Sequence, residues 1–274
     1  MKIDAHQHFW NYDPLRHDWI TDEMSVIRQS FTPEDIQPLL AEHGFDACVL
    51  IQVQQSEEET TSFLELAQQH AFIGGVVGWL DLRANDLGER IDTFAQDNAF
   101  KGVRHILQAE PEGFMTDPRF IAGVTELAKK DLSYDILTTE SQLPEVLQFI
   151  DRLPEMRLVI DHLSKPDIKN NSFDQWAEHM NVLSQYEHVH VKLSGMATEA
   201  CWQTWQAADL KPYIDYCLEQ FGPSRLMFGS DWPVCLIAGS YGRVLDSLLE
   251  AISELSTDEK NQILGETAAT FYRI

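Results

Sequence analysis

The sequence has few cationic side chains and no long apolar run. It holds 20 Lys and Arg against 44 Asp and Glu in 274 residues, a formal net charge of −24. This charge repels phosphate backbones and anionic lipid headgroups, so nucleic acids and membrane surfaces are not expected partners. No stretch of about 18 consecutive apolar residues is present that would span a bilayer. The expected partner is therefore a small molecule.

Cysteine and the common catalytic signatures are also scarce. The four cysteines lie far apart and form no Cys-x-x-Cys pair, as expected for reduced thiols rather than a disulfide framework. The first residues contain no cationic stretch leading into an apolar run, so we expect no secretory signal and a cytoplasmic location. The absence of Gly-x-Ser-x-Gly, P-loop and Gly-x-Gly-x-x-Gly motifs argues against a serine hydrolase, a nucleotide phosphate site and a dinucleotide site.

Short apolar runs alternate with longer amphipathic stretches along the whole chain. Several of these runs are apolar on both alternating faces, which is typical of parallel strands buried on both sides. We expect eight strands, at Ile3–His8, Ala47–Val53, Ile73–Trp79, Gly102–Leu107, Ser133–Leu137, Arg157–His162, His188–Leu193 and Arg225–Asp231. Parallel strands need crossover connections, and closure removes the sheet edges. The pattern therefore predicts an α/β fold, a (β/α)8 TIM barrel formed as one domain by residues 1–274. An open doubly wound sheet is the alternative, but no Gly-rich phosphate loop follows the first run.

Three histidines and one aspartate lie near the carboxyl ends of the predicted strands. Alternate side chains of a strand share a face, so His6 and His8 should project to the same side. His162 and Asp231 end the sixth and eighth predicted strands, and catalytic groups of such barrels gather at these ends. This set of donors is suited to hold Zn²⁺, or to polarise a carbonyl while Asp231 takes a proton from water. A helix-capping role before Trp232 is the alternative for Asp231.

Other predicted strands carry further polar candidates. Arg104 and His105 are adjacent at the end of the fourth run, so only one of them should face the pocket. Asp135 lies in the fifth run, where a catalytic role and a structural hydrogen bond are equally compatible with burial. Lys192 lies in the apolar seventh run, and its ammonium needs either a structural ion pair or a substrate oxygen.

A long aromatic-rich segment, at about 9–31, follows the first predicted strand. It contains Trp10 and Trp19, and a connection of this length is usually functional or disordered; its aromatic content argues against disorder. The loop after the eighth run adds Trp232 and Tyr241. We expect these aromatic side chains, Trp10 and Trp232 above all, to wall the pocket, with packing under the barrel rim as the alternative.

Five motifs of the chain resemble the amidohydrolase superfamily, in its branch of sugar-lactone and pyrone-lactone hydrolases of the L-fuconolactonase and L-rhamnonolactonase type. These motifs are Ile3-Asp4-Ala5-His6-Gln7-His8-Phe9-Trp10, Gly102-Val103-Arg104-His105, Asp161-His162-Leu163-Ser164-Lys165-Pro166, Val191-Lys192-Leu193-Ser194-Gly195 and Met227-Phe228-Gly229-Ser230-Asp231-Trp232-Pro233. The resemblance covers essentially the whole chain and implies an amidohydrolase-like (β/α)8 barrel.

The resemblance also implies roles for individual residues. The central site positions of the branch fall on His6, His8, His162 and Asp231. Arg104 and Lys192 fall on positions that contact substrate oxygens, and Trp10, Trp232, Asp135 and His105 are further candidates for substrate contact. The fifth strand ends without histidine and the fourth without a metal-bridging lysine, so a binuclear centre is not expected. One divalent metal, Zn²⁺, is the expected cofactor, and a metal-independent reaction is left open.

The reaction that the resemblance implies is hydrolysis of a sugar lactone to its aldonic acid. Asp231 would activate water, and the histidines, or a metal that they hold, would stabilise the oxyanion with help from Lys192 or Arg104. One alternative is a metal-dependent decarboxylase of an aromatic or muconate-like acid, which would reuse the same positions. A second alternative is a lactonase of pyrone dicarboxylates, and a third is a binding module without catalysis.

Overall fold

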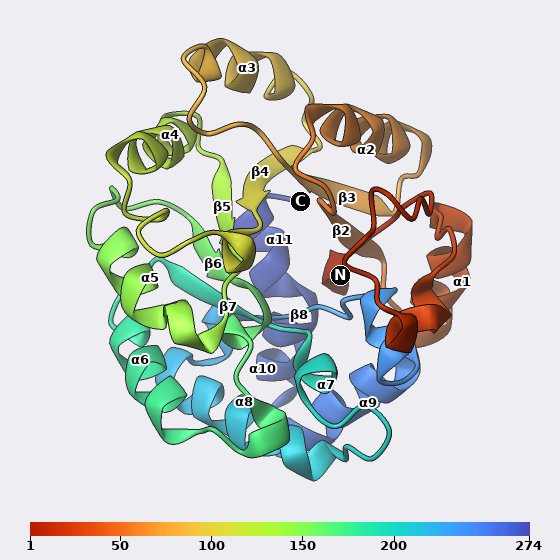
Figure 1. The fold of residues 1–274 in the computed structure, drawn as a ribbon. Coiled ribbons are helices and arrows are strands. Elements are labelled where there is room, and N and C mark those ends of the chain that lie inside the picture. Colours follow the sequence, from red (N-terminus) through yellow and green to blue (C-terminus); the bar gives the residue numbers. More distant parts are fainter.

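Eight parallel strands pair in chain order, from β1 to β8, in a computed structural model that describes residues 1–274 (Figure 1). The strands are β1 (Ile3–Gln7), β2 (Ala47–Ile51), β3 (Ile73–Gly78), β4 (Phe100–His105), β5 (Ser133–Ile136), β6 (Leu158–Ile160), β7 (Val189–Leu193) and β8 (Leu226–Phe228). Each overlaps one of the predicted runs. The ring is closed between its first and last members by a parallel bridge from Gln7 to Trp232. The predicted (β/α)8 TIM barrel is confirmed.

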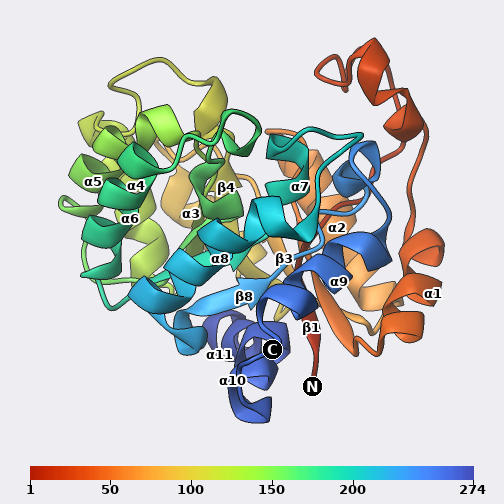
Figure 2. The ribbon, with the colours of Figure 1, turned by 90° about the horizontal axis from the view of Figure 1, so that it is seen from below.

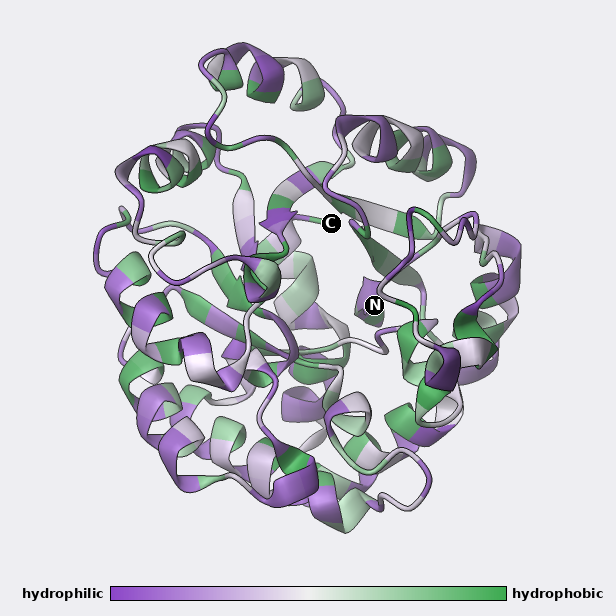
Figure 3. Ribbon diagram, in the orientation of Figure 1, coloured by the Kyte–Doolittle hydropathy of each residue, from purple (hydrophilic) through white to green (hydrophobic).

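Helices surround the barrel, and most of them cover its outer face (Figure 1). They are α1 (Pro33–His43), α2 (Glu57–Gln69), α3 (Leu87–Phe94), α4 (Pro118–Lys129), α5 (Leu143–Ile150), α6 (Asp174–Ser184), α7 (Met196–Glu199), α8 (Ala207–Phe221), α9 (Tyr241–Ala251), α10 (Thr257–Asn261) and α11 (Thr267–Tyr272). Figure 3 shows hydrophilic residues along the outward helix faces and hydrophobic residues on the strands. This distribution is the amphipathic pattern that buries one helix face. No helix is long and apolar enough to cross a membrane.

Two strands end before the site residues that their apolar runs were predicted to include. β6 ends at Ile160 and β8 at Phe228, so His162 and Asp231 lie beyond the sheet rather than in it. Both residues have left-handed backbone, with φ of +54° and +56°. Non-glycine residues in this conformation are uncommon and cluster at functional sites. The turns after the strands, rather than the strand pleat, therefore aim these two side chains.

β1 contains an irregularity that decides which way its histidines point. Between Asp4 and Gln7 the strand advances three residues while β2 advances two, from Cys48 to Leu50. Ile3 belongs to the buried cluster inside the barrel, so a regular strand would turn His6 outward toward the helices. The extra residue is a β-bulge, which shifts the phase of the pleat. His6 then faces the barrel interior, while Gln7 contacts Cys48 on the outer side.

Asp4 stabilises this bulge and the closure of the barrel. Its Oδ1 accepts a hydrogen bond from the N–H of His6 at 3.2 Å and from the N–H of Ser230 at 2.9 Å. Two backbone bonds continue the seam, from Asp231 N–H to His6 O at 2.8 Å and from His8 N–H to Trp232 O at 2.7 Å. Buried backbone donors must be satisfied, and here one carboxylate serves two of them.

The amino-terminal end of the barrel is closed by the last helix of the chain. Phe271 and Tyr272 of α11 pack against inward-facing strand residues such as Ala5, Val159 and Met227. In Figure 2 both termini and α11 lie at one end of the barrel, and the segment after β1 lies at the other. The open end is therefore the carboxyl end of the strands, where barrel enzymes place their sites.

Candidate active site

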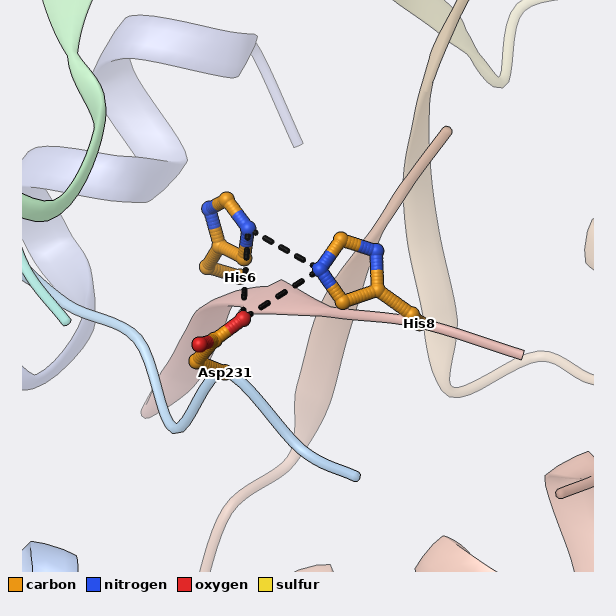
Figure 4. Close-up of side chains that lie close together, drawn as sticks. All are labelled: His6, His8 and Asp231. Carbon is orange, nitrogen blue, oxygen red and sulfur yellow. Dashed lines mark hydrogen bonds and ion pairs between the residues drawn. The ribbon is translucent and has the colours of Figure 1, made fainter. Parts of the chain in front are cut away.

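Three imidazoles and one carboxylate converge at the carboxyl end of the barrel. His6 Nε2 lies 3.2 Å from His8 Nε2, and Asp231 Oδ1 lies 3.3 Å from His8 Nε2 and 3.8 Å from His6 Nε2 (Figure 4). His162 Nε2 is 4.0 Å from the same carboxylate oxygen. All four side chains are buried. The structure thus brings together the four residues that the sequence predicts as the centre of the site.

Hydrogen bonds behind each ring set its orientation. His8 Nδ1 lies 2.9 Å from the carbonyl oxygen of Ile51, and only a protonated nitrogen can bond to a carbonyl. His8 therefore presents the lone pair of Nε2 to the site. His162 Nδ1 lies 2.8 Å from the hydroxyl of Ser194, which holds that ring from β7.

The site is electrostatically arranged to keep its imidazoles neutral and its carboxylate charged. Burial lowers the pKa of His162 to about 4 and also lowers the pKa of His8. Burial alone would raise the pKa of Asp231, but the adjacent imidazoles, His162 foremost, hold it below its usual range. At neutral pH the site therefore contains an ionised carboxylate beside neutral rings.

Arg104, rather than His105, faces the barrel interior. The Arg104 guanidinium donates to Gln52 Oε1 at 2.9 Å, to the backbone oxygen of Gln52, and to Asp161 Oδ2 at 3.0 Å. Its Nη1 is also 3.2 Å from His6 Nε2. His105 points outward, where its ring stacks on Phe114 and bonds to Glu110. The predicted substrate contact at His105 is therefore corrected, because that ring belongs to the helix layer.

A charged layer, made of Arg104, Asp135, Asp161 and Lys192, crosses the barrel below His6. Lys192 Nζ lies 2.6 Å from Asp135 Oδ2 and 3.0 Å from Asp161 Oδ1. Lys192 and Asp135 have no exposed surface and lie outside the cavity above the site. The prediction that they contact substrate is corrected: they are in the interior layer beneath the imidazoles.

A cavity of about 480 Å³ opens above the four central residues. Its floor includes His8, His162, Asp231 and Arg104, and its polar rim includes Lys165 and Glu199. Apolar side chains form most of the remaining wall, with contributions from Trp10, Trp19, Met24, Val53, Ile106, Leu137, Trp202, Val234 and Ile237. A cavity of this size with few convergent polar groups is typical of a small-molecule site.

The two tryptophans predicted to wall the pocket have different positions. Trp10 lines the cavity, and its indole N–H donates to the backbone oxygen of Gln29 at 2.8 Å. Trp232 instead packs edge-on against Phe9 and Phe31 and lies outside the cavity lining. The prediction for Trp232 is therefore corrected in favour of the alternative, packing under the barrel rim.

Several residues of the site escaped the sequence analysis. Asp161 lies between His6 and the two buried cations, and its position directly before His162 was the available signal. Glu199 and Lys165 form a loose ion pair of 3.8 Å at the rim. Neither residue lies at the end of a predicted strand, because Glu199 is in the short α7 and Lys165 follows a left-handed turn. Their place becomes evident only in three dimensions.

The central residues fit a divalent metal. His6 Nε2, His8 Nε2 and Asp231 Oδ1 can each serve as a ligand atom, and these three atoms lie 3.2, 3.3 and 3.8 Å from one another. Neighbouring nitrogen and oxygen ligands of tetrahedral zinc, at bonds of about 2.0–2.1 Å, lie about 3.3 Å apart. With its proton on Nδ1, 3.5 Å from Asp161 Oδ1, His6 has a lone pair at Nε2, which faces Arg104 Nη1 at 3.2 Å and would leave that contact to bind the metal. This donor set is of the kind that zinc prefers.

The barrel and this set of groups define the class of hydrolases that activate water at the carboxyl ends of parallel strands. Comparison with known proteins specifies the family. Residues 3–274 match the amidohydrolase family, and the chain belongs to it.

The chain is similar over its full length to two curated relatives and to a solved structure. It is 40% identical to an L-fucono-1,5-lactonase of Burkholderia multivorans and 36% identical to one of Burkholderia ambifaria, in each case over 100% of this chain and 96% of the relative. A crystal structure of an amidohydrolase from Burkholderia multivorans with bound zinc superposes with a TM-score of 0.97 at 39% identity, over 100% of this chain and 99% of that one.

Proposed function

We propose that the protein is a lactonase that opens L-fucono-1,5-lactone, or a sugar lactone closely similar to it, to the aldonic acid. The convergence of Asp231 with His6, His8 and His162 below a cavity is the observation that carries this proposal. The two lactonases that are 36–40% identical over the whole chain support the sugar lactone as substrate.

The charges of the cavity favour a neutral substrate. Two cations, Arg104 and Lys165, are matched by two carboxylates, Asp231 and Glu199, among the lining residues. Four of the five Arg104 donors already bond within the protein. A dicarboxylate or an aromatic acid would need unpaired cations at this position, so the pyrone-dicarboxylate and decarboxylase alternatives are not favoured. A polyhydroxylated lactone needs only hydrogen-bonding groups and an apolar wall, which the cavity has.

The reaction would use these residues as follows. Asp231, ionised at neutral pH, accepts a proton from water as the water attacks the lactone carbonyl. The carbonyl oxygen gains negative charge, and the fifth Arg104 donor, on Nη2, is free of protein partners and can donate to it. Collapse of the tetrahedral intermediate breaks the ring ester bond. The proton taken by Asp231 then passes to the departing ring oxygen, which leaves a hydroxyl group and a carboxylic acid, and the acid releases its remaining proton to solvent as the carboxylate forms.

A zinc ion would be held by His6, His8 and Asp231. When bound, it would supply Lewis-acid polarisation of the carbonyl and acidify water. His162 lies beside both His6 and Asp231, with its ring centroid 4.4 Å from that of His6, and Ser194 fixes its ring. His162 would hold the attacking water or the ring oxygen of the substrate in the correct position.

The experiment is an acid-release assay with purified protein and freshly prepared L-fucono-1,5-lactone, followed with a pH indicator against the uncatalysed rate. Asp231→Asn should lower kcat by at least about 10²-fold, because the general base is lost. Asp215→Asn is the matched control, since this exposed carboxylate of α8 pairs only with Lys211. Wild-type turnover in Asp231→Asn would contradict the mechanism. Carbon dioxide release from an aromatic acid, without lactone opening, would contradict the reaction class.

A further inference from the structure

The charged layer below the site reaches from the catalytic histidine to the end of the chain. Lys192 Nζ has three near neighbours, Asp135 Oδ2 at 2.6 Å, Asp161 Oδ1 at 3.0 Å and His6 Nδ1 at 3.3 Å. The two carboxylates pair with this ammonium, because His6 Nδ1 carries the proton that faces Asp161. No part of the Lys192 side chain is exposed and it does not line the cavity, so it does not reach a substrate.

The last helix contributes a hydroxyl to the same layer. Tyr272 of α11 donates to Asp135 Oδ2 at 2.7 Å, the oxygen that also accepts from Lys192. The Lys192 ammonium also lies over the Tyr272 ring, 5.5 Å from its centroid. Tyr272 is fully buried and does not line the cavity, and its helix α11 lies at the closed end of the barrel (Figure 2). Its hydroxyl thus touches nothing that a substrate can reach.

Asp161 connects this layer to His6. Its Oδ2 accepts from Arg104 at 3.0 Å, and its Oδ1 lies between Lys192 at 3.0 Å and His6 Nδ1 at 3.5 Å. A carboxylate behind the distal nitrogen of an imidazole fixes the ring orientation and the tautomer that leaves the other nitrogen free. Asp161 keeps this position only while its two cations stay in place.

We propose that Lys192 is a positioning residue for His6 and that Tyr272, two residues from the end of the chain, completes the relay Tyr272–Asp135–Lys192–Asp161–His6. The two carboxylates and two cations of the charged layer balance one another inside the barrel. The members of a buried network of ion pairs and hydrogen bonds are coupled, so removal of one member shifts its neighbours. This inference rests on the proposed function in one respect, the role of His6 in the lactonase reaction.

Tyr272→Phe is the sharpest test, because it removes one hydroxyl and keeps the ring. Tyr216→Phe is the matched control, since the Tyr216 hydroxyl donates to the Ala177 backbone oxygen at 2.9 Å between outer helices. Both variants lose one hydrogen bond and should melt at similar temperatures. We expect only Tyr272→Phe to lower kcat, by about 3- to 10-fold with KM unchanged, below the 10- to 100-fold typical of direct partners of a ligand.

Calorimetric titration with Zn²⁺ alone gives a second readout that needs no lactone. The affinity should fall in Tyr272→Phe and fall further in Asp135→Asn, which keeps the side-chain shape but removes the charge that holds Lys192. Wild-type kcat and wild-type zinc affinity in both variants would overturn the relay. If wild-type protein opened no lactone, the proposed function would fail, and the zinc titration would still decide the relay.

Discussion

A half-buried glutamate beside the site permits a quantitative test of the electrostatics of this barrel. Glu59, in the first turn of α2, accepts hydrogen bonds from the N–H groups of Val53 at 2.8 Å and Gln54 at 2.9 Å. Val53 lines the cavity, so this carboxyl stabilises part of its wall. Burial raises the pKa of Glu59 from 4.5 to about 7, although both backbone bonds oppose the shift. Glu59→Gln keeps an acceptor oxygen and removes the charge.

The sign of the effect follows from proton binding. Between pH 4.5 and about 7 the folded protein retains a proton on Glu59 that the unfolded chain has lost, as its raised pKa requires. The folded state binds more protons, so this group lowers the free energy of unfolding as pH rises through this window. At about 1.4 kcal/mol per pKa unit, the loss reaches about 3 kcal/mol above pH 7. The side chain introduced in Glu59→Gln does not titrate, so this variant does not lose that free energy of unfolding.

Urea denaturation of wild type and Glu59→Gln at several pH values from 4 to 8 measures the effect. Groups common to both proteins cancel in the difference. We expect the difference in unfolding free energy to move by about 3 kcal/mol in favour of Glu59→Gln as pH rises from 4 to 8. A difference that stays constant with pH would show that Glu59 is solvated like an exposed side chain and would refute the reasoning.

Two further predictions concern the central residues. Gly195 has φ of +64°, and a Cβ there would lie 2.6 Å from His162 Nδ1. Gly195→Ala should therefore displace the His162 ring and lower kcat in the lactone assay. Gly44→Ala is the control, because Gly44 has a similar φ of +71° but no atom within 4 Å of the added Cβ, and this variant should retain activity. Equal activity of both variants would contradict a role for His162. Metal-stripped protein should bind one Zn²⁺ per chain by calorimetry, and His8→Gln, which removes a ligand, should weaken this binding by about 10-fold or more. Undiminished zinc affinity in His8→Gln would place the ion elsewhere.

The sequence was sufficient for the fold because each strand has its own apolar signature. All eight predicted runs overlap an observed strand, and the differences are confined to their ends. His162 and Asp231 were predicted inside strands but lie in the turns that follow. Left-handed backbone at these residues has no counterpart in hydrophobic periodicity, which reports burial and not backbone conformation.

The site was only partly predictable from the sequence, for a different reason. Residue types and predicted strand ends suffice to predict that the imidazoles and Asp231 lie together, because these signals are local in the sequence. They do not reveal depth along the barrel axis, which separates Arg104 in the cavity floor from Lys192 and Asp135 beneath it. They also leave the choice between Arg104 and His105 open, because the phase of each strand depends on its packing against neighbours.

The bulge in β1 shows that a His-x-His spacing does not by itself define a site of this kind. The spacing ensures that the two rings share a side of the strand, and the extra residue of the bulge, between Asp4 and Gln7, decides which side that is. A chain with the same two histidines in an unbroken strand would direct both rings into the surrounding helices, where they would meet apolar neighbours instead of ligands and water. Asp4, two positions before the first histidine, therefore helps to decide whether the two rings can act together at all.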